Sequence, residues 1–144
     1  MSCARTRSWA AWAIALMLLL GAAGCGPKYY TVRGKVTFPD GTPLTEGMVV
    51  FESKGDAQPV MARGEIQPDG SYELGTVQPR DGVALGTYRV LVAPKADPNA
   101  VDKRQTTLPF DARFMDFATS DLVFEVKAQA NDFPITVTKT KKPG

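Results

Sequence analysis

The chain has 144 residues, with 17 Lys and Arg against 15 Asp and Glu, for a formal net charge of +2. This near balance gives no strong basic field, so nucleic acid is not an expected partner. The chain contains no histidine. Ser-His-Asp and Cys-His catalysis and histidine-bound zinc or copper are therefore excluded within this chain.

The first 24 residues have the three-part layout of a secretory signal, which we expect to be helical. Arg5 and Arg7 form a short positive leader, and residues 9–20 form an uncharged apolar run. Small residues then precede Cys25. A run this short is poorly suited to span a hydrocarbon core of about 30 Å, whereas it suits a cleaved export signal.

Ala22-Ala23-Gly24-Cys25 resembles the bacterial lipobox, with Ala22 where leucine is usual. The resemblance implies cleavage between Gly24 and Cys25 and a diacylglyceryl group on the Cys25 thiol, since two or more acyl chains anchor a protein stably. Residues 25–29 would then be the lipidated anchor and a short tether, reaching at most about 15 Å. The predicted location is outside the cytoplasm, lipid-anchored to the cell membrane or the outer membrane. An ordinary signal cut nearby is the alternative.

Removal of residues 1–24 takes Arg5 and Arg7 away, which leaves 15 basic and 15 acidic residues. It also takes Cys3 away and leaves Cys25 as the remaining cysteine. The mature domain therefore has no disulfide available and must be stabilised by its core. About 115 residues are enough for one such domain.

Residues 30–138 read as all-β. Residues 30–38 alternate apolar and polar, and residues 48–53 are apolar on both faces. Residues 60–66 and 71–74 flank the turn Pro68-Asp69-Gly70 and predict a hairpin. Further strands are predicted over 87–93, 122–126 and 133–138. Seven short strands without a convincing amphipathic helix predict a Greek-key β-sandwich.

The gap from Lys95 to Asp121 is long for a connection. Its second half carries Phe110, Phe114 and Phe117, which predict a segment packed on the domain, with a short turn of helix. The competing interpretation is a ligand-binding loop. Residues 139–144 read as a basic, flexible tail.

The order of several motifs resembles carboxypeptidase regulatory-like domains, a transthyretin-like sandwich family. The matching segments are Val32-Arg33-Gly34-Lys35-Val36-Thr37, Asp40-Gly41-Thr42-Pro43-Leu44, Asp69-Gly70-Ser71-Tyr72 and Gly86-Thr87-Tyr88-Arg89-Val90. Small lipoproteins built from one such domain also carry a segment similar to Leu108-Pro109-Phe110 with Phe114. The resemblance implies a non-catalytic folding, interaction or spacer module.

Few side chains remain as candidates for catalysis or metal binding. Glu46, Glu52, Glu65 and Glu73 are acids that adjacent strands can bring together, and two carboxylates suffice for a glycosidase. The segment Asp97–Asp102 fails the EF-hand pattern because Val101, Asp102 and Leu108 hold the fifth, sixth and twelfth positions. Asp111, Asp116 and Asp121 read as solvated loop acids. No catalytic residue, metal site or cofactor is predicted.

Two functions therefore follow from the sequence. The first is a membrane-anchored cell-envelope lipoprotein whose sandwich is a non-catalytic interaction or structural module, with an envelope protein or polysaccharide as partner. The alternative is a glycan- or small-ligand-binding protein that uses the loop 95–121. The exposure of Phe110, Phe114 and Phe117 distinguishes the two, since a sugar-binding platform needs solvent-facing rings.

Overall fold

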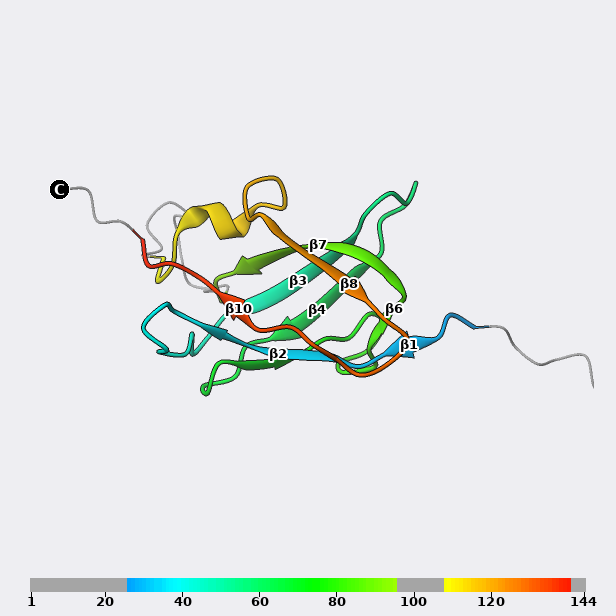
Figure 1. The fold of residues 1–144 in the computed structure, drawn as a ribbon, viewed down its shortest axis with the longest axis horizontal. Helices are drawn as coiled ribbons and strands as arrows, with labels where there is room; N and C mark the ends of the chain where they lie inside the picture. The colour runs from blue at the N-terminus through cyan, green and yellow to red at the C-terminus, as the bar shows by residue number, and fades with distance from the viewer. Residues whose placement is uncertain (1–25, 96–107, 141–144) are drawn as a thin grey trace, which may run out of the picture.

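The computed structural model describes residues 26–95 and 108–140, and this part of the chain is all-β (Figure 1). Its single helical element is a 3₁₀ turn, η1 (Ala112–Met115). The strands are short and follow in the order β1 (Tyr29–Tyr30), β2 (Val32–Thr37), β3 (Met48–Ser53), β4 (Met61–Glu65), β5 (Ser71–Glu73), β6 (Val83–Ala84), β7 (Gly86–Ala93), β8 (Leu122–Val126), β9 (Asn131–Asp132) and β10 (Ile135–Thr136).

Two sheets of four strands make up most of the domain. The first has the order β4-β3-β7-β8, and every neighbouring pair is antiparallel. In the second, β2 is central, with β5 antiparallel on one side. On its other side β2 pairs in parallel with both β9 and β10. The two ends of the described chain therefore lie side by side in this sheet.

Both sheets contribute their apolar faces to one core. The period of two predicted for residues 87–93 is confirmed, because Tyr88, Val90 and Val92 are buried while Arg89 is half-buried on the other face. Phe51 lies at the centre of an aromatic group, with ring centroids 5.9 to 6.1 Å from those of Tyr88, Phe124 and Phe133. Full burial of each large apolar side chain contributes about 1.5–3 kcal/mol, so this core is a major source of the domain's stability.

The strand predicted over residues 30–38 is interrupted at Thr31. Before that point β1 pairs with β6, a two-residue strand that the sequence analysis did not predict. A strand of two residues carries no alternation, so pattern reading cannot find it. Gly82 permits the pairing, since a Cβ there would stand 2.7 Å from the carbonyl oxygen of Tyr30.

The hairpin predicted over residues 60–74 forms only in part. Its turn is present, with Gly70 at a φ of 84° and Asp69 accepting a hydrogen bond of 3.0 Å from the Ser71 N–H. The two strands then separate, because β4 pairs with β3 in one sheet and β5 pairs with β2 in the other. The hairpin thus connects the two sheets instead of lying in one.

The second half of the long connection packs on the domain. Phe110 and Phe114 are 0% and 2% exposed, and η1 lies against β7. The predicted short helical turn is confirmed by η1, which Asp111 caps through a 3.0 Å bond from the Arg113 N–H. Residues 96–107 lie outside the described residues.

The first two residues assigned to the tail also contact the domain. Lys139 Nζ lies 3.0 Å from Asp40 Oδ2. The Thr140 hydroxyl donates to the carbonyl oxygen of Phe110 at 2.8 Å. The other four residues of the predicted tail, 141–144, lie outside the described part.

Candidate binding groove beside strands β2, β4 and β5

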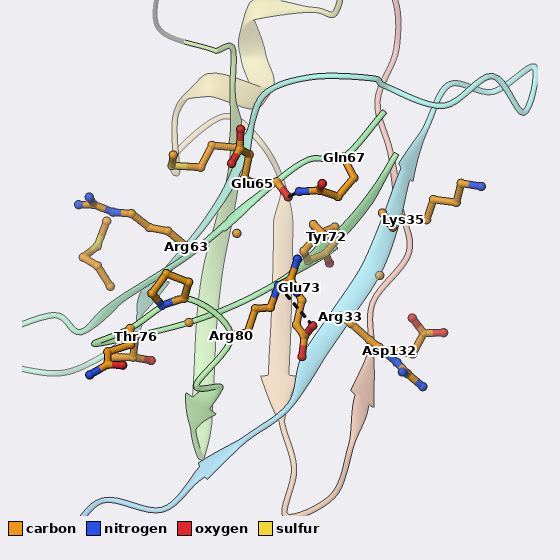
Figure 2. A pocket seen from close by; sticks show the side chains of 18 of the residues that line it. Arg33, Lys35, Arg63, Glu65, Gln67, Tyr72, Glu73, Thr76, Arg80 and Asp132 are labelled. Atoms are coloured by element: carbon orange, nitrogen blue, oxygen red, sulfur yellow. Dashed lines mark hydrogen bonds and ion pairs between the residues drawn. The ribbon is translucent and has the colours of Figure 1, made fainter. Parts of the chain in front are cut away.

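An open groove of about 1250 Å³ lies at the junction of the two sheets (Figure 2). Its walls come from β2, β4, β5 and the loop of residues 75–80, and Asp132 of β9 adds to one side. Seven charged side chains line it: Arg33, Lys35, Arg63, Arg80, Glu65, Glu73 and Asp132. It is therefore a polar surface groove and not an enclosed apolar pocket.

Three positions that line the groove are glycines, because another backbone segment lies too close there to leave room for a Cβ atom. A Cβ on Gly34 would stand 2.1 Å from the carbonyl oxygen of Phe133, far inside van der Waals contact. On Gly64 it would stand 2.6 Å from the Glu73 carbonyl oxygen, and on Gly75 1.9 Å from that of Gln78. Close backbone packing therefore explains glycine at positions 34, 64 and 75.

The groove lies where the β4–β5 hairpin opens. The hairpin is closed near its turn by Gln67 N–H donating to the Ser71 carbonyl at 2.8 Å. It is closed again by two 2.9 Å bonds between Arg63 and Gly75. The register places Glu65 opposite Glu73 between these points, and no backbone hydrogen bond joins those two residues within residues 26–95. Like charges directly opposite each other disfavour strand pairing, which is consistent with the opening at this position.

Charges alternate across the second sheet on the groove side. Arg33 is in register with Asp132 of β9 and with Glu73 of β5. Arg80 Nε lies 3.9 Å from Glu73 Oε2, and both side chains are well exposed. Among residues 26–95 and 108–140 this is the sole ion pair in the groove, so most of its charges face solvent. Solvated charges of both signs are suited to contact a partner of mixed polarity.

Asp81 holds the loop that forms one wall. Its carboxylate accepts backbone hydrogen bonds from Thr76, Val77 and Gln78 at 2.6, 3.1 and 2.9 Å. Desolvation on its own would raise the pKa of Asp81, but these N–H donors favour the charged form and hold its pKa below the usual value. The loop also needs left-handed backbone at Arg80, with a φ of 65°. The wall shape therefore depends on one ionised carboxylate.

Tyr72 connects the groove to the core. Its ring is buried, and its hydroxyl donates to the carbonyl oxygen of Phe133 at 2.6 Å. Burial raises the pKa of Tyr72 well above the ordinary tyrosine value, with the nearby Asp132 charge adding to the effect. The phenol consequently stays neutral and serves as a structural bond between β5 and the segment joining β9 to β10.

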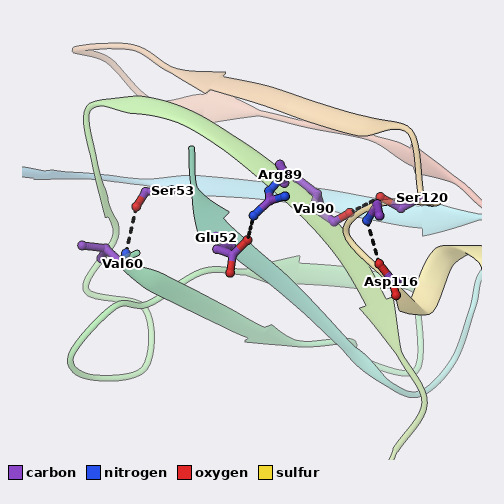
Figure 3. A network of polar contacts seen from close by, with 8 residues as sticks. Glu52, Ser53, Val60, Arg89, Val90, Asp116 and Ser120 are labelled. Carbon is purple, nitrogen blue, oxygen red and sulfur yellow. Dashed lines mark hydrogen bonds and ion pairs between the residues drawn. The ribbon is translucent and has the colours of Figure 1, made fainter. Parts of the chain in front are cut away.

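A second set of polar contacts lies on the first sheet and its flanking segments (Figure 3). Glu52 of β3 pairs with Arg89 of β7, its cross-strand neighbour. The Arg89 guanidinium lies 5.7 Å from the centroid of Phe117. Ser120, buried, donates to the Val90 carbonyl at 2.5 Å. The Ser120 bond and the Arg89–Phe117 contact attach the segment of residues 116–120 to β7.

The structure brings together two of the four acids singled out in the sequence. Glu65 and Glu73 both line the groove, while Glu52 is paired with Arg89 and Glu46 does not line it. Asp111 and Asp116 accept backbone hydrogen bonds within their own turns, as expected of loop acids. Asp121 is exposed, with a φ of 56°.

The cleavage and lipidation residues Gly24 and Cys25 lie outside the described residues, as does Asp97–Asp102. Within the described part, no group of three or more His, Cys, Asp or Glu side chains is placed to hold a metal ion. The same part contains no helix long and apolar enough to cross a membrane.

The sequence analysis did not predict the groove. One feature of the sequence could have indicated the groove: a regular hairpin about the turn at residues 68–70 places Glu65 opposite Glu73. The charges contributed by β2 and β9 become neighbours of this pair only through long-range pairing. Sequence spacing does not contain that information.

Comparisons with known proteins give no match: no family model, no curated protein and no solved structure is similar to the chain.

Proposed function

We propose that the chain is a membrane-anchored cell-envelope lipoprotein whose β domain is a non-catalytic interaction or structural module. The support for the anchor is chemical: a positive leader, an apolar run and small residues immediately before Cys25. The tether is short, because β1 begins at Tyr29. Export followed by lipidation of Cys25 would hold the domain at the cell membrane or the outer membrane.

We further propose that the domain is a seven-stranded Greek-key sandwich of the carboxypeptidase regulatory-like, transthyretin-like kind. Taking β1 with β2 and β9 with β10 as single interrupted strands, and leaving out the two-residue β6, gives that number. The strand orders β4-β3-β7-β8 and β10-β2-β5 support it, since the chain passes repeatedly between the two sheets, from β2 to β3, from β4 to β5, from β5 to β7 and from β8 to β9. The motif order between residues 32 and 90 adds the family resemblance.

The observation that carries the interaction hypothesis is the groove. It is open, about 1250 Å³ in volume, and lined by solvated charges of both signs. Small-molecule sites are mostly apolar and enclose their ligand, whereas protein surfaces and charged polymers match a wide polar surface. The proposed partner is an envelope protein or an envelope polysaccharide that contacts Arg33, Lys35 and Asp132 on one side of the groove and Arg63 and Glu65 on the other.

A catalytic function has weaker support. The chain has no histidine, which removes the commonest general base. Glu65 and Glu73 are the one carboxylate pair in the groove, and Arg80 lies beside Glu73. The position of the Arg80 guanidinium beside Glu73 is that of an ion pair. A general acid instead needs surroundings that raise its pKa.

The alternative of glycan or small-ligand binding by the loop 95–121 also has less support. Phe110 and Phe114 are buried, so they cannot stack on a sugar. Phe117 is half-buried and lies against Arg89. A row of solvent-facing rings, which this function requires, is not formed by these three residues.

Two measurements test the proposal. Intact mass of protein extracted from membranes should give an N-terminal peptide that begins at Cys25 and carries acyl chains, and Cys25→Ala should abolish it. A photo-reactive amino acid at Gln67 or Gln78, both in the groove, should then give adducts that are absent when it replaces the exposed Ala118. Arg63→Glu should reduce those adducts. An unmodified soluble chain would refute the anchor, and equal adducts at Ala118 would refute the groove.

A further inference from the structure

One end of the domain gathers half-exposed apolar side chains and lysines. We call it the N-terminal pole and define it by Lys28, Tyr29, Tyr30, Lys54, Val60, Leu85 and Lys127. Hydrogen bonds and strand register place these segments together: Tyr29 pairs with Ala84, Lys54 N–H donates to the Thr87 carbonyl at 2.8 Å, and Gly86 pairs with Val126. The β1 and β6 labels mark this end in Figure 1.

The apolar side chains of the pole are partly or largely exposed, and that of Tyr30 also packs against the core. Leu85 is 55% exposed and Val60 is 39% exposed, while Tyr29 and Tyr30 are half-buried. Single exposed apolar residues are ordinary on protein surfaces, but here they are grouped with two tyrosines. Tyrosine places an apolar ring and a polar hydroxyl in one side chain, and for this reason it is enriched where protein meets the membrane–water interface.

The charged groups of the pole are mainly cationic. Lys28, Lys54 and Lys127 are exposed, against the acids Asp56 and Glu125. Lys28 Nζ lies 5.8 Å from the centroid of the Tyr30 ring, so its stem follows the apolar surface. Long lysine side chains can keep their charge at the level of the headgroups while their methylene groups cover apolar surface. This combination of tyrosines, leucine and lysines fits an anionic lipid surface.

The tether supplies the second argument. If Cys25 carries the lipid, residues 26–28 alone separate it from β1, and a span this short reaches about 15 Å at most. The end of the domain nearest the membrane must then be the end at which β1 lies. The composition of the exposed surface and the position of the proposed anchor therefore both indicate that the N-terminal pole faces the membrane.

We propose that the N-terminal pole docks on the headgroup region of the membrane that holds the anchor, with Leu85, Tyr29 and Tyr30 at the interface and the lysines on anionic lipids. This inference rests on the proposed lipidation of Cys25. No residue of the N-terminal pole lines the groove, so docking by the pole leaves the groove available to a partner.

The test uses the full lipoprotein, purified from membranes and reconstituted in vesicles of phosphatidylethanolamine and phosphatidylglycerol that contain a nitroxide-labelled lipid. Leu85→Cys and Met115→Cys each introduce a thiol for a fluorophore, since acylation of Cys25 and loss of Cys3 leave no other. Both residues are exposed apolar positions, 55% and 38%, and Met115 lies in η1 away from the pole. We expect strong quenching of the label at position 85 and little at 115.

Charge variants test the electrostatic part. Each lysine near an anionic surface contributes about 1 kcal/mol, which corresponds to about a fivefold change in the docked-to-undocked ratio. Lys127→Glu should therefore reduce the docked-to-undocked ratio, obtained from the quenching at position 85, by that factor or more. Lys95→Glu, at an exposed lysine that follows the opposite end of β7, is the matched control and should leave it unchanged.

The outcomes separate the two proposals. An acylated Cys25 with equal quenching at positions 85 and 115 would overturn the docking surface and leave the anchored module standing. An intact mass without acyl chains would overturn both. Quenching confined to position 85 in anionic vesicles, and reduced by Lys127→Glu alone of the two lysine variants, would support the docking surface.

Discussion

Replacement of Asp81 by alanine should destabilise the domain by about 2 kcal/mol at neutral pH. Its carboxylate is the shared acceptor for three backbone N–H groups in the groove wall. Each hydrogen bond to a charged group is worth about 1.5–3 kcal/mol when fully protected. The loop is largely exposed, however, and water can replace the lost acceptor, so the cost should approach the upper end of a lost helix N-cap, about 2 kcal/mol.

The effect should also depend on pH. The native pKa of Asp81 is lowered, so the unfolded chain binds more protons than the native chain as pH falls through the ordinary aspartate range near 4. Stability from this carboxylate is therefore present above that range and is lost as pH falls toward the lower native pKa. The difference between wild type and Asp81→Ala should shrink between pH 5 and the acid limit of folding.

Urea unfolding followed by circular dichroism at pH 7 and pH 3.5 measures both effects. Asp56→Ala is the matched control, because its carboxylate is exposed and accepts no hydrogen bond from the described residues; its cost should be within about 0.5 kcal/mol at either pH. Equal stability of wild type and Asp81→Ala at pH 7 would refute the assignment of the loop to this carboxylate. A cost independent of pH would refute its ionic character.

Three other substitutions test the packing of the site and of the long connection. Gly34→Ala should cost about 3 kcal/mol or more in thermal or urea unfolding, since its Cβ would stand 2.1 Å from a backbone oxygen; near-neutral behaviour would contradict the close approach. Tyr72→Phe should cost about 1–2 kcal/mol because it leaves the Phe133 carbonyl without its 2.6 Å donor, and an unchanged urea midpoint would count against that bond. Phe110→Ala should lower the free energy of unfolding by about 3–5 kcal/mol, and Phe117→Ala should lower it by about 1 kcal/mol or less. The reverse order would contradict the packing of these rings and would favour the hypothesis of a ligand-binding loop.

Local patterns in the sequence were sufficient for most of the strands. Alternation predicted β7 and β8, an apolar run predicted β3, and the Asp69–Gly70 pair predicted its turn, because these features depend on neighbours within a few residues. The burial of Tyr88 in β7 follows from the same alternation. The proposed export and lipidation signal before Cys25 is likewise a local sequence pattern, and this interpretation stays a prediction.

Tertiary structure decided what local patterns could not. The hairpin prediction is confirmed only in part: its turn and the Arg63–Gly75 bonds form, but β4 takes β3 and β5 takes β2 as its partner in a sheet, which local patterns do not determine. The groove follows from that separation, and its charges on β2 and β9 meet through a parallel pairing between the two ends of the described chain. Alternation determines which face of a strand is buried, but the partner of each strand is chosen by the packing of the whole core.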